Sequence, residues 1–265
     1  MWLRVSCNLE MEFTVESPLI LLLRPRSDAS QWIARDRYAV WPALAVEEYA
    51  DMYGNPCQRL LAPPGHFQIE VCSDVRLPVE PQSVNGGAFI PVQDLPSETL
   101  MYLAPSRYCE SDKLGRLVHD VVGDSAPGHD QVAAITHWIH RRLPYRGDSD
   151  PTPVSAVEAL ERGDGVCRDF AHLGIALCRA LSIPARIIVG YLHRLDPMDL
   201  HAWFEAYVGG QWVAFDPTRP EMSGGRVHLA HGRDAADVPV FTQFGPPVIP
   251  FRMEVAVDEI PGPER

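Results

Sequence analysis

The sequence predicts an α+β protein in which an antiparallel β region is followed by helices and further antiparallel strands. Three observations support this prediction: strand-like alternation and many prolines in the first hundred or so residues, three later segments with helical spacing, and a two-glycine turn between two apolar runs. A chain of 265 residues with 46% hydrophobic content suits two domains. We expect a β-sandwich-like domain over residues 1–105 and a second domain over residues 106–265.

In the first domain, residues 67–71 alternate apolar and polar side chains, and residues 53–56 (Tyr-Gly-Asn-Pro) form a turn signal. Short strands separated by turns are typical of a sandwich or barrel. A loop over residues 78–105 leads to the domain boundary. The strands are expected around residues 2–15, 17–24, 38–48, 58–62, 66–73 and 75–80.

Helical periodicity begins after the boundary. Apolar residues fall on one stripe over residues 112–122, and again over residues 129–143. A third helix is predicted over residues 166–181, with apolar residues at spacings of three and four, and Pro184 follows its end.

Antiparallel strands complete the second domain. Residues 185–192 are almost continuously apolar, which indicates a buried strand. Residues 201–208 and 211–216 read as two strands, and Gly209-Gly210 between them is a strong hairpin signal. The remainder of the chain is predicted to be mostly irregular, with one edge strand near residues 251–257.

Composition limits the classes of function. A formal net charge of −12 and a pI near 5.2 argue against nucleic-acid binding and against attachment to an anionic membrane. The apolar run at residues 18–23 is too short to span a bilayer, and no secretory leader pattern is found, so we expect a cytoplasmic protein. The cysteines form no C-x-x-C pair, which favours free thiols in a reducing compartment. They are Cys7, Cys57, Cys72, Cys109, Cys167 and Cys178.

Cys167 stands in the first turn of the third predicted helix. Unpaired N–H groups and the helix dipole at such an N-terminus favour a thiolate. The preceding Gly-Asp-Gly at residues 163–165 could let a substrate carbonyl approach the backbone, with the N–H of Cys167 as an oxyanion donor. On this evidence alone, the role of a small buried apolar residue stays open.

The predicted hairpin supplies two partners for a thiolate. With the two glycines as loop residues, counting back along both strands places Trp203 opposite Asp216. His201 then projects from the same face as Asp216, as a diagonal neighbour at roughly 7–8 Å between Cβ atoms. A carboxylate at this position can orient an imidazole that accepts a thiol proton. A solvated His–Asp pair without a catalytic role is the alternative.

Three blocks of the sequence resemble the transglutaminase-like superfamily, specifically its bacterial members with an N-terminal β domain. Further similarity lies at Trp138-Ile139, Tyr145, residues 48–55 and residues 232–238. The three blocks are residues 163–173 (GDGVCRDFAHL), 201–207 (HAWFEAY) and 212–218 (WVAFDPT).

The resemblance implies a papain-like or transglutaminase-like core, in which a helix that begins with the catalytic cysteine packs on an antiparallel sheet. It also implies a triad of Cys167, His201 and Asp216 that acts on a peptide or amide through a thioester, without a cofactor. Hydrolysis is favoured over transamidation by analogy with bacterial relatives. A cross-linking transglutaminase and a non-catalytic binding or assembly module are the alternatives. Metal binding by Cys167, His172, Cys178 and His201 lacks any usual ligand spacing.

Four further residues are candidates for contacts around the triad. Asp169 and His172 follow the cysteine, and local hydrogen bonding is the alternative to a contact with substrate or triad. Tyr191 and Trp203 are candidates for the cleft wall, as is Glu205, which shares a face with Trp203; core packing is the alternative. The side chain that completes the oxyanion hole and the oligomeric state are not assigned.

Overall fold

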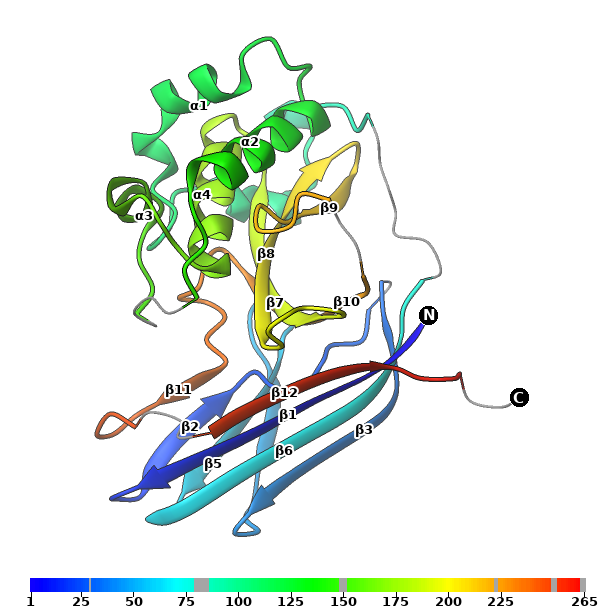
Figure 1. Ribbon diagram of the computed structural model, residues 1–265, viewed down its shortest axis with the longest axis vertical. Helices are drawn as coiled ribbons and strands as arrows, with labels where there is room; N and C mark the ends of the chain where they lie inside the picture. The colour runs from blue at the N-terminus through cyan, green and yellow to red at the C-terminus, as the bar shows by residue number, and fades with distance from the viewer. Residues whose placement is uncertain (29, 79–85, 148–151, 222–223, 249–251, 263–265) are drawn as a thin grey trace.

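The computed structural model describes residues 1–28, 30–78, 86–147, 152–221, 224–248 and 252–262. It confirms the predicted α+β class. Figure 1 shows two β-sheets at one end of the molecule and a third sheet covered by helices at the other. Strand pairing in all three sheets is antiparallel.

The first two sheets form a sandwich. Alternate residues of β1, from Leu3 to Phe13, are buried, and they share one apolar core with residues of the second sheet such as Leu19 and Leu60. The first sheet has the order β12 (Arg252–Glu259), β1 (Trp2–Phe13), β6 (Gly65–Arg76) and β3 (Trp32–Trp41). The second has the order β11 (Phe241–Gln243), β2 (Ser17–Leu21), β5 (Pro56–Ala62) and β4 (Glu47–Ala50).

Several strand boundaries differ from the prediction. The two strands expected over residues 66–73 and 75–80 are largely one long strand, β6, while the single strand expected over residues 38–48 is divided between β3 and β4. Residues 79–80 of that expectation, and residues 79–85 of the expected loop, lie outside the described residues. The register of β6 against both β1 and β3 explains its length, because pairing on both sides stabilises strand residues that lack a strong local signal.

The described residues form four α-helices, which are α1 (Gly115–Val122), α2 (His129–Arg142), α3 (Ala156–Arg162) and α4 (Cys167–Ala180). Short 3-10 helices precede them at Val92–Asp94, Ser97–Tyr102 and Ser111–Lys113. Helix α3 was not predicted, although Ser155 and Glu158 form a capping box: the Glu158 N–H donates to Ser155 Oγ at 3.3 Å, and the Ser155 N–H donates to Glu158 Oε2 at 2.7 Å. None of the helices in the described ranges is long and apolar enough to cross a membrane.

The third sheet has the order β10 (Arg226–Gly232), β7 (Ala185–Leu192), β8 (Leu200–Val208) and β9 (Gln211–Phe215). The predicted two-residue hairpin is confirmed, because Val208 pairs with Gln211. Helix α4 packs on β7 and β8, where alternate residues such as Ala202 and Phe204 join the helices in one core. Strand β10 lies in a segment that the sequence predicted to be irregular.

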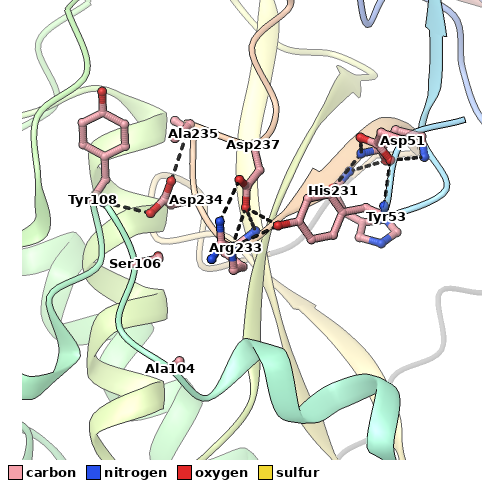
Figure 2. A network of polar contacts seen from close by, with 12 residues as sticks. Asp51, Tyr53, Ala104, Ser106, Tyr108, His231, Arg233, Asp234, Ala235 and Asp237 are labelled. Atoms are coloured by element: carbon pink, nitrogen blue, oxygen red, sulfur yellow. Dashed lines mark hydrogen bonds and ion pairs between the residues drawn. The ribbon is translucent and has the colours of Figure 1, made fainter.

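The N-terminal sandwich docks on the third sheet through polar contacts. Asn55 Nδ2 donates to the carbonyl of His231 at 2.8 Å, and the N–H of His231 donates to Asn55 Oδ1 at 2.9 Å. The hydroxyl of Tyr53 donates to Asp237 Oδ2 at 2.6 Å, and Arg233 Nε contacts the same oxygen at 2.9 Å (Figure 2). Two of the sequence blocks outside the predicted triad, residues 48–55 and 232–238, therefore meet each other.

The end of the chain returns to the sandwich. Strand β12 pairs along β1, and β11 pairs with β2. The expected edge strand near residues 251–257 thus corresponds to β12, although residue 251 itself lies outside the described part of the chain. The division into residues 1–105 and 106–265 stays a prediction, and β11 and β12 add strands to sheets built mainly from the first part.

Candidate active site

Cys167 is the first residue of α4, so its side chain and N–H lie at the helix N-terminus. Asp169 holds this turn: its Oδ2 accepts hydrogen bonds from the N–H of Val166 and from Arg162 Nη2, both at 3.1 Å. A Cβ on Gly165 would lie 2.9 Å from the Cβ of Asp169, so the close packing of the loop requires glycine there. The loop before Cys167 is therefore held in place by buried contacts.

His201 and Asp216 form a buried pair at the end of the β8–β9 hairpin. His201 Nε2 lies 2.8 Å from Asp216 Oδ2. Because an ionised carboxylate only accepts hydrogen bonds, Nε2 carries the hydrogen and donates it, which leaves Nδ1 for another partner. The other carboxylate oxygen accepts from the Thr218 hydroxyl at 2.6 Å and from the Thr218 N–H at 3.0 Å.

The environment favours opposite charges on this pair. Burial alone would lower the pKa of His201, but hydrogen bonds to Asp216 and to Cys167 outweigh it and raise the pKa to about 9. Burial alone would raise the pKa of Asp216, but the contacts with His201, Thr218 and the Arg226 cation hold it below its usual value. At neutral pH the imidazolium and the carboxylate are the favoured forms.

The buried Trp203 and the partly buried Arg226 lie beside the pair. The Trp203 ring stacks near the His201 ring, with 6.3 Å between centroids, and the Arg226 guanidinium carbon lies 5.8 Å from the Trp203 centroid. Arg226 Nη2 is 3.6 Å from Asp216 Oδ2. Nη2 and Nε of Arg226 have no hydrogen-bond partner in the described ranges. The charge of Arg226 thus acts on Asp216 through space.

Of the other predicted site residues, Trp203 lies against His201, and Asp169 supports the start of α4. The prediction that Tyr191 lines a cleft is not met: its side chain is fully buried in the core of the sandwich, because the end of β7 at which Tyr191 pairs with Leu200 packs there. Glu205 is also buried and pairs with Arg186, at 2.7 Å from its Nη2.

His172 lies in the first half of α4 and makes structural contacts. Its Nδ1 lies 3.1 Å from the carbonyl of Val154, and its Nε2 accepts from the N–H of Ala235 at 3.1 Å. Cys178 is fully buried in the helix core. Within the described segments, no group of three or more His, Cys, Asp and Glu residues is arranged to hold a metal ion.

The cysteines differ in accessibility. All six are free thiols, and Cys167 and Cys72 are the two that are partly exposed. Burial raises the pKa of Cys7 to about 12 and also raises the pKa of Cys57, Cys109 and Cys178, which keeps these thiols protonated at neutral pH.

Sequence reasoning missed the roles of Thr218 and Arg226. Thr218 stands two residues after Asp216 in the third sequence block, and a hydroxyl at this spacing commonly bonds a preceding carboxylate in a turn. Arg226 carried no local signal, because its proximity to Asp216 arises from the pairing of β10 with β7.

Comparison with known proteins identifies the class to which this fold and site belong. The family model of the transglutaminase-like superfamily matches residues 115–217. A crystal structure described as a "Putative Cysteine Protease" from Cytophaga hutchinsonii is 36% identical, covers 100% of this chain and 92% of that chain, and has a TM-score of 0.91. The chain belongs to the transglutaminase-like superfamily.

Curated relatives extend the similarity to mycobacteria. An uncharacterized protein from Mycobacterium leprae is 28% identical over 231 residues, which are 82% of each chain. Another uncharacterized protein, from Mycobacterium bovis, is 26% identical over 273 residues and covers 90% of this chain and 85% of that protein. The similarity therefore includes both the sandwich and the helical region.

Proposed function

We propose that this protein is a cysteine-dependent amidase or peptidase that works through a thioester formed on Cys167. The observation that carries the proposal is the buried His201–Asp216 pair, in which Asp216 and the Cys167 thiol at the start of α4 raise the pKa of His201 to about 9. A thiolate there is stabilised by the imidazolium and by the helix N-terminus. The family and the similarity to the Cytophaga hutchinsonii protein support the reaction class.

In the first half of the reaction, the Cys167 thiolate attacks the substrate carbonyl carbon and forms a carbon–sulfur bond. The N–H of Cys167 donates to the developing oxyanion. The carbon–nitrogen bond then breaks, and the departing amine takes the proton from the His201 imidazolium. A thioester remains on the enzyme.

In the second half, the neutral His201 imidazole removes a proton from water, and the resulting hydroxide attacks the thioester carbonyl. The carbon–sulfur bond breaks, the carboxylic acid leaves, and the thiolate–imidazolium pair is restored. Asp216 stays ionised throughout: it holds the imidazole by its Nε2 and stabilises the cationic form. An amine in place of the water would give transamidation from the same thioester.

The experiment is to incubate the wild-type protein with a mixed amide and peptide library and to measure its intact mass. We expect an acyl adduct on Cys167 that is absent from Cys167→Ala and retained in Cys72→Ala, the control for the other partly exposed cysteine. Release of acid indicates hydrolysis, whereas incorporation of an added labelled amine indicates a cross-linking transglutaminase. Absence of any adduct, with reversible retention of library members, would favour a binding module.

A further inference from the structure

A cavity of about 580 Å³ opens between the last turns of α2 and the segment that follows β9. Its lining includes Thr218, whose hydroxyl contacts Asp216 Oδ1 at 2.6 Å and His201 Nε2 at 3.4 Å. The cavity therefore borders the His201–Asp216 pair through Thr218. The remaining lining residues are His137, His140, Arg141, Arg219, Pro220 and Glu221.

The α2 side of this cavity is built by one helix face. His137, His140 and Arg141 are spaced by three and four residues, so their side chains lie on the same side of α2. His140 Nδ1 lies 3.0 Å from the carbonyl of Pro217, which fastens this face to the residue that follows Asp216. The cavity and the candidate site are thus mechanically linked.

The two arginines of the cavity have no carboxylate partner among the residues that the structure describes. Many arginines of this chain pair with carboxylates, as Arg186 does with Glu205. Among the described residues, Arg141 and Arg219 form no ion pair, and the hydrogen bond from Arg219 Nη1 goes to a neutral acceptor, the Arg194 carbonyl, at 3.1 Å. Glu221 is the one acidic side chain of the lining.

The local charge opposes the charge of the whole chain, which is −12. An anionic substrate is repelled by most of such a molecule, so a cluster of unpaired guanidinium groups beside the triad gives it a preferred place to dock. Guanidinium groups also match the geometry of a carboxylate, to which they donate two parallel hydrogen bonds.

We infer that this cavity, between Arg141 and Arg219, binds a carboxylate group of the substrate next to the bond that is cleaved. This inference rests on the proposed function. It specifies the substrate class as peptides or amides that carry an acidic group beside the reacting carbonyl. The carboxylate comes either from an Asp or Glu side chain or from the carboxyl end of a peptide.

Binding to the Cys167→Ala protein tests the inference without turnover. The probes are tetra-alanine peptides in which Glu or Gln replaces each alanine in turn, each with a free or an amidated carboxyl end, and titration calorimetry gives the Kd. We expect an acidic peptide to bind about five- to tenfold more tightly than its neutral counterpart at low salt. A preference for Glu over Gln indicates a side-chain carboxylate, and a preference for the free end indicates a terminal one.

Matched variants locate the effect. Arg141→Gln with Arg219→Gln should reduce the preference to less than about twofold, and Glu221→Gln should increase it. Arg142→Gln is the control, because Arg142 lies beside Arg141 in the last turn of α2 but does not line the cavity. The inference is overturned if no peptide binds, if acidic and neutral peptides bind equally, or if the Arg142 control loses the preference as fully as the double variant.

The two proposals can fail separately. If wild-type Cys167 forms acyl adducts but the arginine variants do not change the preference among acidic and neutral peptides, the function stands and the cavity assignment falls. If acidic peptides bind in an arginine-dependent manner but no adduct forms on Cys167, the cavity assignment stands and the catalytic proposal falls.

Discussion

The two faces of the third sheet have different chemistry. Along β8, Ala202, Phe204 and Ala206 point into the apolar core under α4, whereas His201, Trp203 and Glu205 alternate with them on the other face. That second face carries ion pairs and buried imidazoles, such as the His201–Asp216 pair. One strand thus has two different faces: the first packs against the helix that begins with Cys167, and the second carries the His201–Asp216 pair to which we assign the proton transfer.

The largest expected effect comes from removing the charge on the polar face. Asp216→Asn keeps the shape of the side chain but removes the negative charge that stabilises the imidazolium. We expect kcat/KM to fall by about 10³- to 10⁴-fold, comparable to loss of the carboxylate in other triads. Thermal unfolding of the same protein provides the control, and a variant with near wild-type activity would contradict the role given to Asp216.

Phe204→Ala tests the apolar face. Phe204 is fully buried, and its ring lies so close to α4 that a Cβ on Gly174 would come within 2.4 Å of it. We expect the free energy of unfolding to decrease by about 3–5 kcal/mol. In the fraction that remains folded, alkylation of Cys167 should stay within about twofold of the wild-type rate.

Trp203→Phe is the matched change on the opposite face. It should cost less stability than Phe204→Ala and alter Cys167 alkylation more, because Trp203 stacks near His201. If the two variants change the free energy of unfolding and the rate of Cys167 alkylation in the same proportion, the apolar face is not specific to stability and the polar face is not specific to reactivity.

The pH dependence of stability tests the charge on His201. Its pKa in the folded protein is raised to about 9 from an ordinary value of 6.5, so the folded state binds the proton more tightly. The stabilisation is fully present below pH 6.5 and is lost as the pH rises through about 9. Over this pH range, the free energy of unfolding of the wild type should decrease by on the order of 2–3 kcal/mol relative to that of His201→Asn. Denaturant unfolding at several pH values measures it, and a difference that does not vary with pH would refute the raised pKa.

A smaller effect is expected for Arg226→Met. The variant removes a cation 3.6 Å from Asp216 and preserves most of the side-chain volume. The pKa of Asp216 should rise, and kcat/KM should decrease by about three- to tenfold, with the loss largest at acidic pH. Arg186→Met, on the same face but paired with Glu205, is the control and should leave the acidic limb of the pH profile in place.

Sequence reasoning was most successful where one local signal determines geometry. The two-glycine turn sets the register of the hairpin, and the register determines which residues share a face, so the proximity of His201 and Asp216 could be predicted without the structure. The helix that begins at Cys167 was predicted from its apolar spacing, and the structure begins α4 at that residue.

The features that were missed depend on contacts between distant segments. Strand β10 alternates polar and apolar residues only over its first four positions, before a register shift between His228 and Ala230, so its local signal is short. Contacts with the sandwich support it, as when the N–H of His228 donates to Gln31 Oε1 at 2.7 Å. Tyr191 was expected in a cleft because the sequence does not show that this residue packs in the core of the sandwich. Helix α3 is the exception, since its capping box was visible in the sequence.

The nucleophilic role of Cys167 is tested most directly by the pH dependence of its alkylation by iodoacetamide. The intact mass of the Cys72→Ala protein reports the labelling, because Cys167 is then the one partly exposed thiol that remains. An activated thiolate predicts rapid single labelling at near-neutral pH, lost in the Cys167→Ala, Cys72→Ala double variant and slowed by Asp216→Asn. Slow labelling that increases only near the ordinary thiol pKa of about 8.5, or fast labelling that persists without Cys167, would show that Cys167 is not the activated nucleophile.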